Sequence, residues 1–204
     1  MNRVIHHAVR RDFDRVTAAL HALPEGDTDR AQAVGRGWDF LHSELTRHHE
    51  GEDQHVWPML AGFGVDADLL ATMESEHQAM SDALTSASVA VHRVVGTATR
   101  EDADVAATAV EHARKIATEH LAHEEGDVEP QIIAHMDSPE WKTTEKQLRK
   151  ASPTTAGQFF AWIQDGMSPE GRAYLDKTVP KPVTFIFSHV FGMGYHRKVA
   201  PAWR

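Results

Sequence analysis

The sequence contains no cysteine among its 204 residues, and this absence excludes several classes of site at once. Disulfide bonds, thiolate metal sites and cysteine nucleophiles all need a thiol, so none of them is available to this chain. Iron–sulfur clusters and sites for soft metals are excluded for the same reason. A metal site in this chain would have to use other ligands, chiefly histidine and carboxylates.

Long apolar runs and basic clusters are missing as well. No apolar run approaches the roughly 18 residues of a membrane span, and the charged N-terminal stretch MNRVIHHAVRRDFDR lacks the apolar segment of a signal peptide. The formal net charge is −9 with no basic stripe, which argues against a nucleic-acid partner. We therefore expect a cytoplasmic protein that binds neither membrane nor nucleic acid.

Helical periodicity is the dominant pattern up to about residue 136. Apolar residues recur at spacings of three and four, and no run alternates as a strand would. The pattern predicts helices over about residues 3–23, 30–60, 67–95 and 102–135. Short loops between them favour an all-α, up-down-up-down four-helix bundle over residues 1–136. The expected apolar face of the last helix contains Val105, Ala109, Ala113, Ile116, Val128 and Ile132.

Residues 137–204 differ in character from the rest of the chain. A polar helix is followed by the stretch TAGQFFAWI and by the apolar, aromatic end VTFIFSHVFGMGYH. We expect a helical C-terminal extension that packs on the bundle or forms an interface, such as a homodimer contact, because an exposed segment of this kind would risk aggregation. Gly192 and Gly194 would allow a close helix approach there. His189 and His196 are expected to pack locally, with one of them capping a metal pocket as the alternative.

Histidine is in excess, with 15 residues against 2 tyrosines. Two stretches repeat one arrangement: HHEGEDQHVWP at 48–58 and HLAHEEGDVEP at 120–130. Each begins with His, has Glu at the fourth place after it, a second acid at the fifth and Pro at the tenth. A spacing of four puts the His and the Glu on one helical face, so each motif presents two potential metal ligands together.

Each predicted helix carries one histidine on its apolar face. At about 1.5 Å per residue, all four lie about 26 Å from the same end of the bundle, so antiparallel helices would place them in one layer. Two helices add an inward glutamate one turn later. The six candidate metal ligands are His6, His48, Glu52, His77, His120 and Glu124.

Six polar side chains in one dry layer need a compensating partner. Unpaired buried carboxylates are costly, and a pair of bound cations removes that cost. Imidazole and carboxylate ligands together suit iron, with manganese or zinc as alternatives. Two carboxylates can each bridge two metals while four imidazoles divide between them. The pattern therefore predicts a dinuclear site, with no catalytic residues beyond the metal ligands.

The polar residues beside the motifs are expected to have other roles. Surface positions are expected for His7, His49, His55 and His123, which lie off the apolar faces. Asp53 and Glu125 are expected to accept hydrogen bonds from ligand N–H groups, with direct metal coordination as the alternative. Met73 and Met80 are expected to pack in the core around the site.

The order of these ligands, from His6 through the His48–Glu52 motif and His77 to the His120–Glu124 motif, resembles the hemerythrin-like (HHE cation-binding) family. The resemblance covers about residues 3–135. It implies a four-helix bundle with two iron ions in a non-haem, oxo- or hydroxo-bridged di-iron centre. Members of the family bind or sense dioxygen, and some are linked to iron, nitric oxide or peroxide handling.

The sequence departs from the oxygen carriers of that family at two places. Carriers have two histidines four apart in the third helix, where this chain has Met73 and then His77. Carriers also have Asp at the fifth place of the last motif, where this chain has Glu124 at the fourth and Glu125 at the fifth. A metal position left open would favour substrate chemistry over reversible storage.

Two functions from different classes are compatible with this pattern. The first is a handler of small oxidants that binds or reacts with dioxygen, peroxide or nitric oxide, for example by catalase-like peroxide breakdown in oxidative stress. The second is a non-catalytic iron or oxygen sensor whose metal site controls stability or partner binding. A structural zinc or manganese bundle without redox function is a third reading. Turnover separates the first two, since an enzyme consumes many equivalents of peroxide without losing iron.

Overall fold

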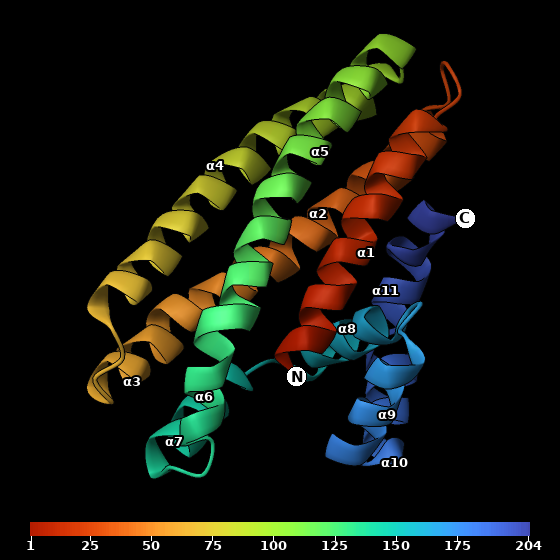
Figure 1. Ribbon diagram of the computed structural model, residues 1–204. Coiled ribbons are helices and arrows are strands. Elements are labelled where there is room, and N and C mark those ends of the chain that lie inside the picture. The colour runs from red at the N-terminus through yellow and green to blue at the C-terminus, as the bar shows by residue number, and fades with distance from the viewer.

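The computed structural model describes all 204 residues, and its regular elements are all helical (Figure 1). The four long helices are α1 (Asn2–His21), α2 (Thr28–Gly51), α4 (Ala67–Thr97) and α5 (Arg100–His123). Two of them continue beyond a π turn: η1 (Glu52–Val56) leads to α3 (Trp57–Gly62), and η2 (Glu124–Val128) leads to α6 (Glu129–His135). The prediction of an all-helical protein is confirmed. No helix has the length and apolar character that crossing a bilayer requires.

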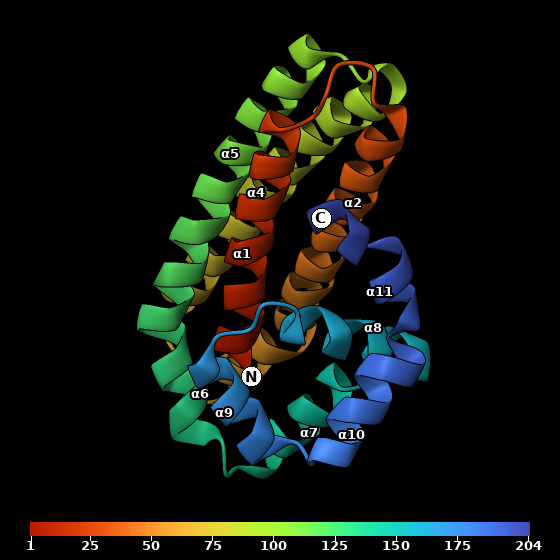
Figure 2. The same cartoon turned by 90° about the vertical axis from the view of Figure 1, so that its right-hand side faces the viewer.

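The long helices enclose one core, in which α5 packs along α4 and α1 while α2 packs along α4 and α1 (Figures 1 and 2). Their starts follow from local chemistry. Asp27, Asp66 and Thr99 cap α2, α4 and α5, and each side chain accepts a hydrogen bond from a backbone N–H of the first turn. Phe13 and Trp38 meet edge to face inside the core, with ring centroids 6.1 Å apart.

The buried face of α5 differs from the predicted one. Val105 was expected to face the core but is 57% exposed. The buried positions of the helix are mostly alanines: Ala103, Ala106, Ala107, Ala113 and Ala117. Ala113 and Val128 are buried as predicted, and Ala109, Ile116 and Ile132 are half-buried. The error is therefore confined to Val105, whose neighbour Ala106 is buried in its place.

Each His–Glu motif is followed by one turn of π-helix. The backbone N–H of Trp57 donates to the carbonyl of Glu52, and that of Glu129 donates to the carbonyl of Glu124. Pro in the next turn has no N–H to donate and crowds the carbonyl four residues before it. The regular hydrogen bonding of the α-helix is therefore interrupted here. The repeated proline thus accounts for an interruption directly after each glutamate, and π turns of this kind are frequent at functional sites.

Residues 137–204 form a run of short helices. They are α7 (Pro139–Leu148), α8 (Pro153–Gln164), α9 (Pro169–Thr178), α10 (Lys181–Ile186), the π turn η3 (Phe187–Phe191), α11 (Met193–Lys198) and the 3-10 turn η4 (Ala200–Trp203). The element α8 contacts α1, and η4 contacts both α1 and α2 (Figure 2). Trp162 and Tyr195 belong to the same buried cluster as the bundle core. The segment therefore packs on the bundle.

A buried acid on α1 lies at the centre of this contact. Asp12 is fully buried and accepts hydrogen bonds from Trp162 Nε1 at 2.8 Å and from Arg15 Nη1 at 3.2 Å. Arg15 also pairs with Asp165 at 3.2 Å, and Tyr195 Oη donates to the same carboxylate at 2.7 Å. Charged and aromatic groups from three parts of the chain thus share one network.

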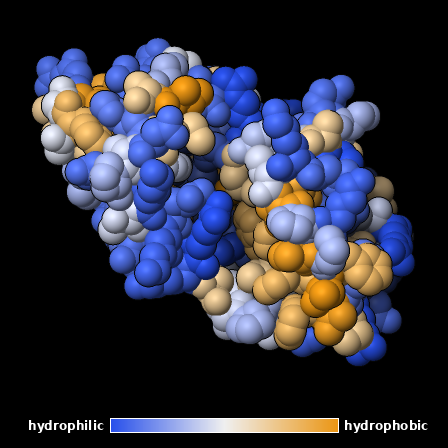
Figure 3. All heavy atoms as spheres, turned by 90° about the horizontal axis from the view of Figure 1, so that it is seen from below, coloured by the Kyte–Doolittle hydropathy of each residue, from blue (hydrophilic) through white to orange (hydrophobic).

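The outer side of α10 and η3 is apolar and exposed. Figure 3 shows apolar side chains gathered at this end of the molecule. They are Val183, Phe185, Ile186, Val190, Phe191 and Met193. His189 packs locally, as expected, with its ring stacked 4.4 Å from that of Phe185. The homodimer contact expected for this segment stays a prediction.

Two glycines bring α8 directly against η3. A Cβ atom at Gly157 would lie 2.4 Å from backbone and side-chain carbons of Phe191, and one at Gly192 would lie 2.6 Å from the carbonyl oxygen of Gly157. The sequence correctly singled out Gly192 for a close helix approach. Its partner is α8 of the same chain, so the glycine serves the internal packing of the extension.

Gly157→Ala is expected to destabilise the protein by about 1–3 kcal/mol, because the neighbouring backbone atoms cannot yield as a flexible side chain would. Gly96→Ala in α4 is the matched control, since a Cβ there meets nothing within 4 Å. The control should leave stability unchanged or raise it by up to about 1 kcal/mol. Urea unfolding followed by circular dichroism measures both changes, and equal effects would contradict the packing argument.

Candidate metal centre

The structure brings the six predicted ligands together inside the bundle, close to the N-terminal end of α1. His6 Nε2 lies 3.1 Å from Glu124 Oε2 and 3.2 Å from His48 Nε2. These three residues come from α1, η2 and α2. Their ligand atoms all lie within 4.8 Å of one another, so one metal ion could contact all three.

A second group of ligand atoms lies beside the first. His77 Nε2 on α4 is 3.1 Å from His120 Nε2 on α5. Glu52 lies between the groups, with Oε1 3.3 Å from His48 Nε2 and Oε2 3.8 Å from His77 Nε2. One carboxylate thus directs an oxygen at each group, as a bridging ligand would.

His49 was expected at the surface, and this expectation is wrong. The residue is only 7% exposed, its ring stacks on that of His77 at 4.2 Å, and it lies with His77 and His120 in a potential metal-binding group. A residue directly after His48 is turned by about 100° around the helix. That rotation would move it off the apolar face of an isolated helix, but α2 packs against two neighbours and its buried surface is wider.

Three buried polar atoms of this cluster have no hydrogen-bond partner: His49 Nε2, Glu52 Oε2 and Glu124 Oε2. A buried polar atom left unpaired costs about 1–3 kcal/mol, and more when it is charged. Their concentration in one cluster is the feature that a bound cation would relieve. The donor set of imidazole nitrogens and carboxylate oxygens also suits iron, manganese or zinc. The residues present therefore fit a metal site.

In the protein without metal, burial also shifts the pKa values of Glu52, His48 and His49 toward the neutral form of each group. Burial, together with the nearby Glu124 carboxylate, raises the pKa of Glu52 well above its usual value. Burial and the neighbouring His6 lower the pKa of His48 to about 3, and burial lowers that of His49 far below its usual value. Both imidazoles are therefore neutral at pH 7, the form that coordinates metal.

Glu124 behaves differently from Glu52. Burial alone would raise its pKa, but the close contact of Oε2 with His6 Nε2, at 3.1 Å, and the positive charge of that ring outweigh burial and lower it to about 2. Its other oxygen, Oε1, accepts a hydrogen bond from Asn2 Nδ2 at 2.6 Å. The ionised carboxylate is therefore held on the side of the first group, with one oxygen free of hydrogen bonds.

Carboxylates outside the cluster orient two of the histidine rings. His6 Nδ1 donates to Glu125 Oε1 at 2.8 Å, and His77 Nδ1 donates to Asp53 Oδ1 at 2.7 Å. In both rings the Nε2 atom then faces the cluster, so the hydrogen bond fixes which nitrogen is free to bind metal. Asp53 and Glu125 thus lie where they were expected, as acceptors for N–H groups.

A third acceptor escaped the sequence analysis. Glu76 on α4 accepts from His120 Nδ1 at 2.9 Å and from His123 Nδ1 at 2.8 Å. His123 is partly buried by this contact and takes no place in the cluster. The acid lies directly before His77 in the sequence, but its partners are on α5, and nothing in the linear pattern pairs the two helices at this position.

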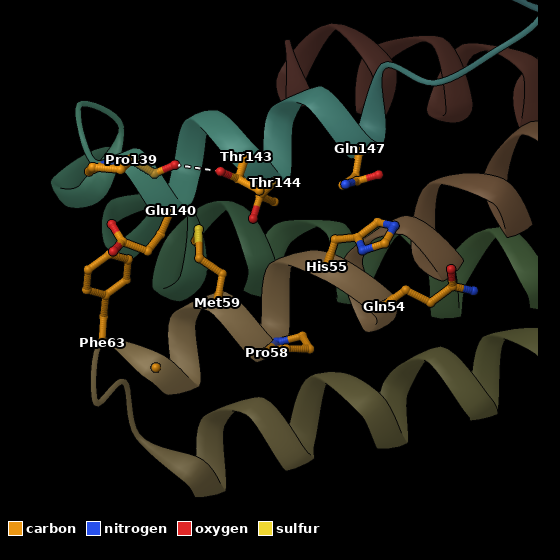
Figure 4. A pocket seen from close by; sticks show the side chains of 11 residues that line it. Gln54, His55, Pro58, Met59, Phe63, Pro139, Glu140, Thr143, Thr144 and Gln147 are labelled. Carbon is orange, nitrogen blue, oxygen red and sulfur yellow. Dashed lines mark hydrogen bonds between the residues drawn. The ribbon is translucent and has the colours of Figure 1, made fainter.

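The remaining residues near the motifs lie as follows. His7 is exposed, as expected, and Met73 is fully buried in a small apolar cluster beside the site. His55 is half-buried and lines a surface pocket of about 590 Å³ between η1, α3 and α7, where it and Met59 face Thr144 (Figure 4). None of the clustered histidines or glutamates lines that pocket. It therefore offers no direct route to the cluster.

The comparisons with known proteins agree with this geometry. The family model described as the hemerythrin HHE cation binding domain matches residues 3–132, which contain every residue of the cluster. No curated protein and no solved structure matches the chain. The match covers well over half of the chain and ends within α6, before the extension begins. The chain therefore belongs to the hemerythrin HHE cation-binding family.

Proposed function

We propose that this protein holds two iron ions in an up-down-up-down four-helix bundle and that it binds or reacts with small oxidants there. Dioxygen, peroxide and nitric oxide are the proposed ligands. One observation carries the proposal: two adjacent groups of buried ligand atoms have the Glu52 carboxylate between them. The buried oxygens of Glu52 and Glu124 that lack a hydrogen-bond partner support the proposal, because a pair of cations would coordinate both of them.

The proposed ligands divide between the two groups. His6, His48 and Glu124 would hold the first metal, and His77 and His120 would hold the second. Glu52 is the best-supported bridge, since it alone has an oxygen near each group. Glu124 is a weaker bridge than the sequence suggested, because one of its oxygens is hydrogen-bonded to Asn2.

The chain's own residues prepare the site for this chemistry. Two bound irons would supply redox equivalents and an open coordination position for a small oxidant. Glu125, Asp53 and Glu76 hold the N–H protons of three rings outside the cluster, so their Nε2 atoms stay available. The ring of Trp57 stacks on that of His77 at 5.8 Å, and Trp57 belongs to a buried apolar cluster with Met73 and Leu60, which limits the access of water on this side of the site.

Metal analysis with an optical spectrum, before and after peroxide addition, tests this proposal. We expect about two irons per chain, with the charge-transfer bands of an oxygen-bridged pair, in protein purified from iron-supplied cells. Sustained gas release on peroxide addition would identify an enzyme. Zinc, or no metal at all, in protein that is fully folded would overturn the di-iron proposal.

A sensor is the second candidate, and the unpaired buried atoms of the site favour it. His49 Nε2, Glu52 Oε2 and Glu124 Oε2 each cost folding free energy in the protein without metal. Metal loss would then lower stability and could be read by a partner. A single-turnover response to peroxide, with a melting temperature that falls sharply on iron chelation, would favour the sensor over the enzyme.

A further inference from the structure

We infer that His49 is a ligand of the second metal, so that the adjacent histidines of α2 serve one ion each. This inference rests on the proposed dinuclear site and adds to it a residue that lies outside the repeated His–Glu motif. His48 belongs to the group with His6 and Glu124, whereas His49 belongs to the group with His77 and His120. A third group joins His48 and His49 to Glu52, so the proposed bridge lies beside both histidines. Each metal would then have three ligands of its own beside the Glu52 bridge.

Burial and orientation are the first support. His49 is 7% exposed, and its Nε2 atom is buried without any hydrogen-bond partner. An imidazole on the surface of a helix would expose that nitrogen to water, and a structural histidine in a core normally has it paired. One ring nitrogen of His49 lies within 4.8 Å of ligand atoms of His77 and His120, which is close enough for one ion to reach all three.

The composition of the second group is the other support. Without His49, this group has two histidines and a share of Glu52, whereas the first group has three ligands of its own. Met73 lies one turn before His77 on α4, but it is fully buried among apolar side chains and is a poor ligand for ferric iron. His49 is the buried nitrogen that brings the second group to the same number of ligands as the first.

A purely structural role is the competing explanation, because the ring of His49 stacks on that of His77 with an angle of 26° between planes. His49→Phe separates the two explanations. Phenylalanine keeps a flat ring for stacking but has no ligand atom. His7→Phe is the matched control, since His7 also directly follows a proposed ligand but is exposed on α1.

The experiment loads each full-length protein anaerobically with ferrous iron, measures bound iron by elemental analysis, and follows a cobalt(II) titration by its visible bands. We expect two metals in the wild type and in His7→Phe, and one in His49→Phe, with the second dissociation constant raised at least about 100-fold. Circular dichroism checks that the helices are intact. If the phenylalanine variant does not fold, His49→Leu takes its place in the same comparison.

Each other outcome has a distinct meaning. Two metals bound by His49→Phe with unchanged affinity would overturn the role of His49 and leave the dinuclear proposal standing. Loss of both metals would overturn its assignment to the second ion alone. Fewer than two metals in the wild type would instead overturn the dinuclear proposal itself, before any variant is compared.

Discussion

Glu52→Ala is expected to reduce the metal content from two ions per chain to one or none, and Glu124→Ala is expected to remove at least one. Glu52 is the residue whose two oxygens lie near both groups, so its loss takes a ligand from each metal at once. Glu124 contributes its free oxygen beside His6. Elemental analysis of purified, iron-loaded protein measures both effects. Retention of two metals by both variants would rule out the proposed ligand set.

Glu50→Ala is the control for this experiment, because Glu50 lies on the same stretch of α2 but is exposed. It should bind two metals like the wild type. Thermal unfolding adds a second readout. A ligand present at 1,000 times its dissociation constant stabilises the folded state by about 4 kcal/mol. We expect the wild type and the control to gain stability on metal addition, whereas Glu52→Ala should lose most of that gain.

The sequence was sufficient to predict the helices and the layer of histidines and glutamates. The reason is periodicity, since a spacing of four places His48 and Glu52 on one face whatever the partner helix does. The predicted starts at about residues 30 and 102 lie close to the observed ones at Thr28 and Arg100, where a capping side chain such as Asp27 acts within its own first turn. Features that depend on one helix alone were therefore accessible.

Features that depend on how two helices meet could not be predicted from the sequence. His49 directly follows the predicted ligand His48 and looks like a surface residue until α2 is packed against both α1 and α4. Glu76 looks like a solvated acid until its oxygens are found beside two histidines of α5. Val105 was placed on the buried face of α5 because its side chain is apolar, but it is 57% exposed and the adjacent Ala106 is buried instead. Each error lies in the pairing of helices.

Asp12→Ala is expected to be the most destabilising change outside the metal centre, with a loss of about 3–5 kcal/mol in the free energy of unfolding. The carboxylate is fully buried and holds Trp162 Nε1 at 2.8 Å and Arg11 Nε at 2.7 Å. Alanine would leave the indole N–H unpaired and the largely buried guanidinium without its closest negative charge. Since domains are stable by only about 5–15 kcal/mol, this is a large fraction of the total.

Asp14→Ala is the matched control on the same helix. Asp14 pairs with Arg114, but the acid is 58% exposed, so its loss should cost at most about 1 kcal/mol. Urea unfolding gives both values, and similar losses for the two variants would show that the buried network does not hold the extension to α1.

Tryptophan fluorescence separates local release of the extension from global loss of stability. Trp162 is fully buried in the contact with α1, whereas the proposed metal ligands lie on α1, α2, α4 and α5 and their π turns. If Asp12 acts mainly by docking the extension, Asp12→Ala should shift the emission to longer wavelength below the main unfolding transition while the protein still binds two metals. If metal content falls together with the fluorescence change, the extension is instead part of what holds the metal layer in place.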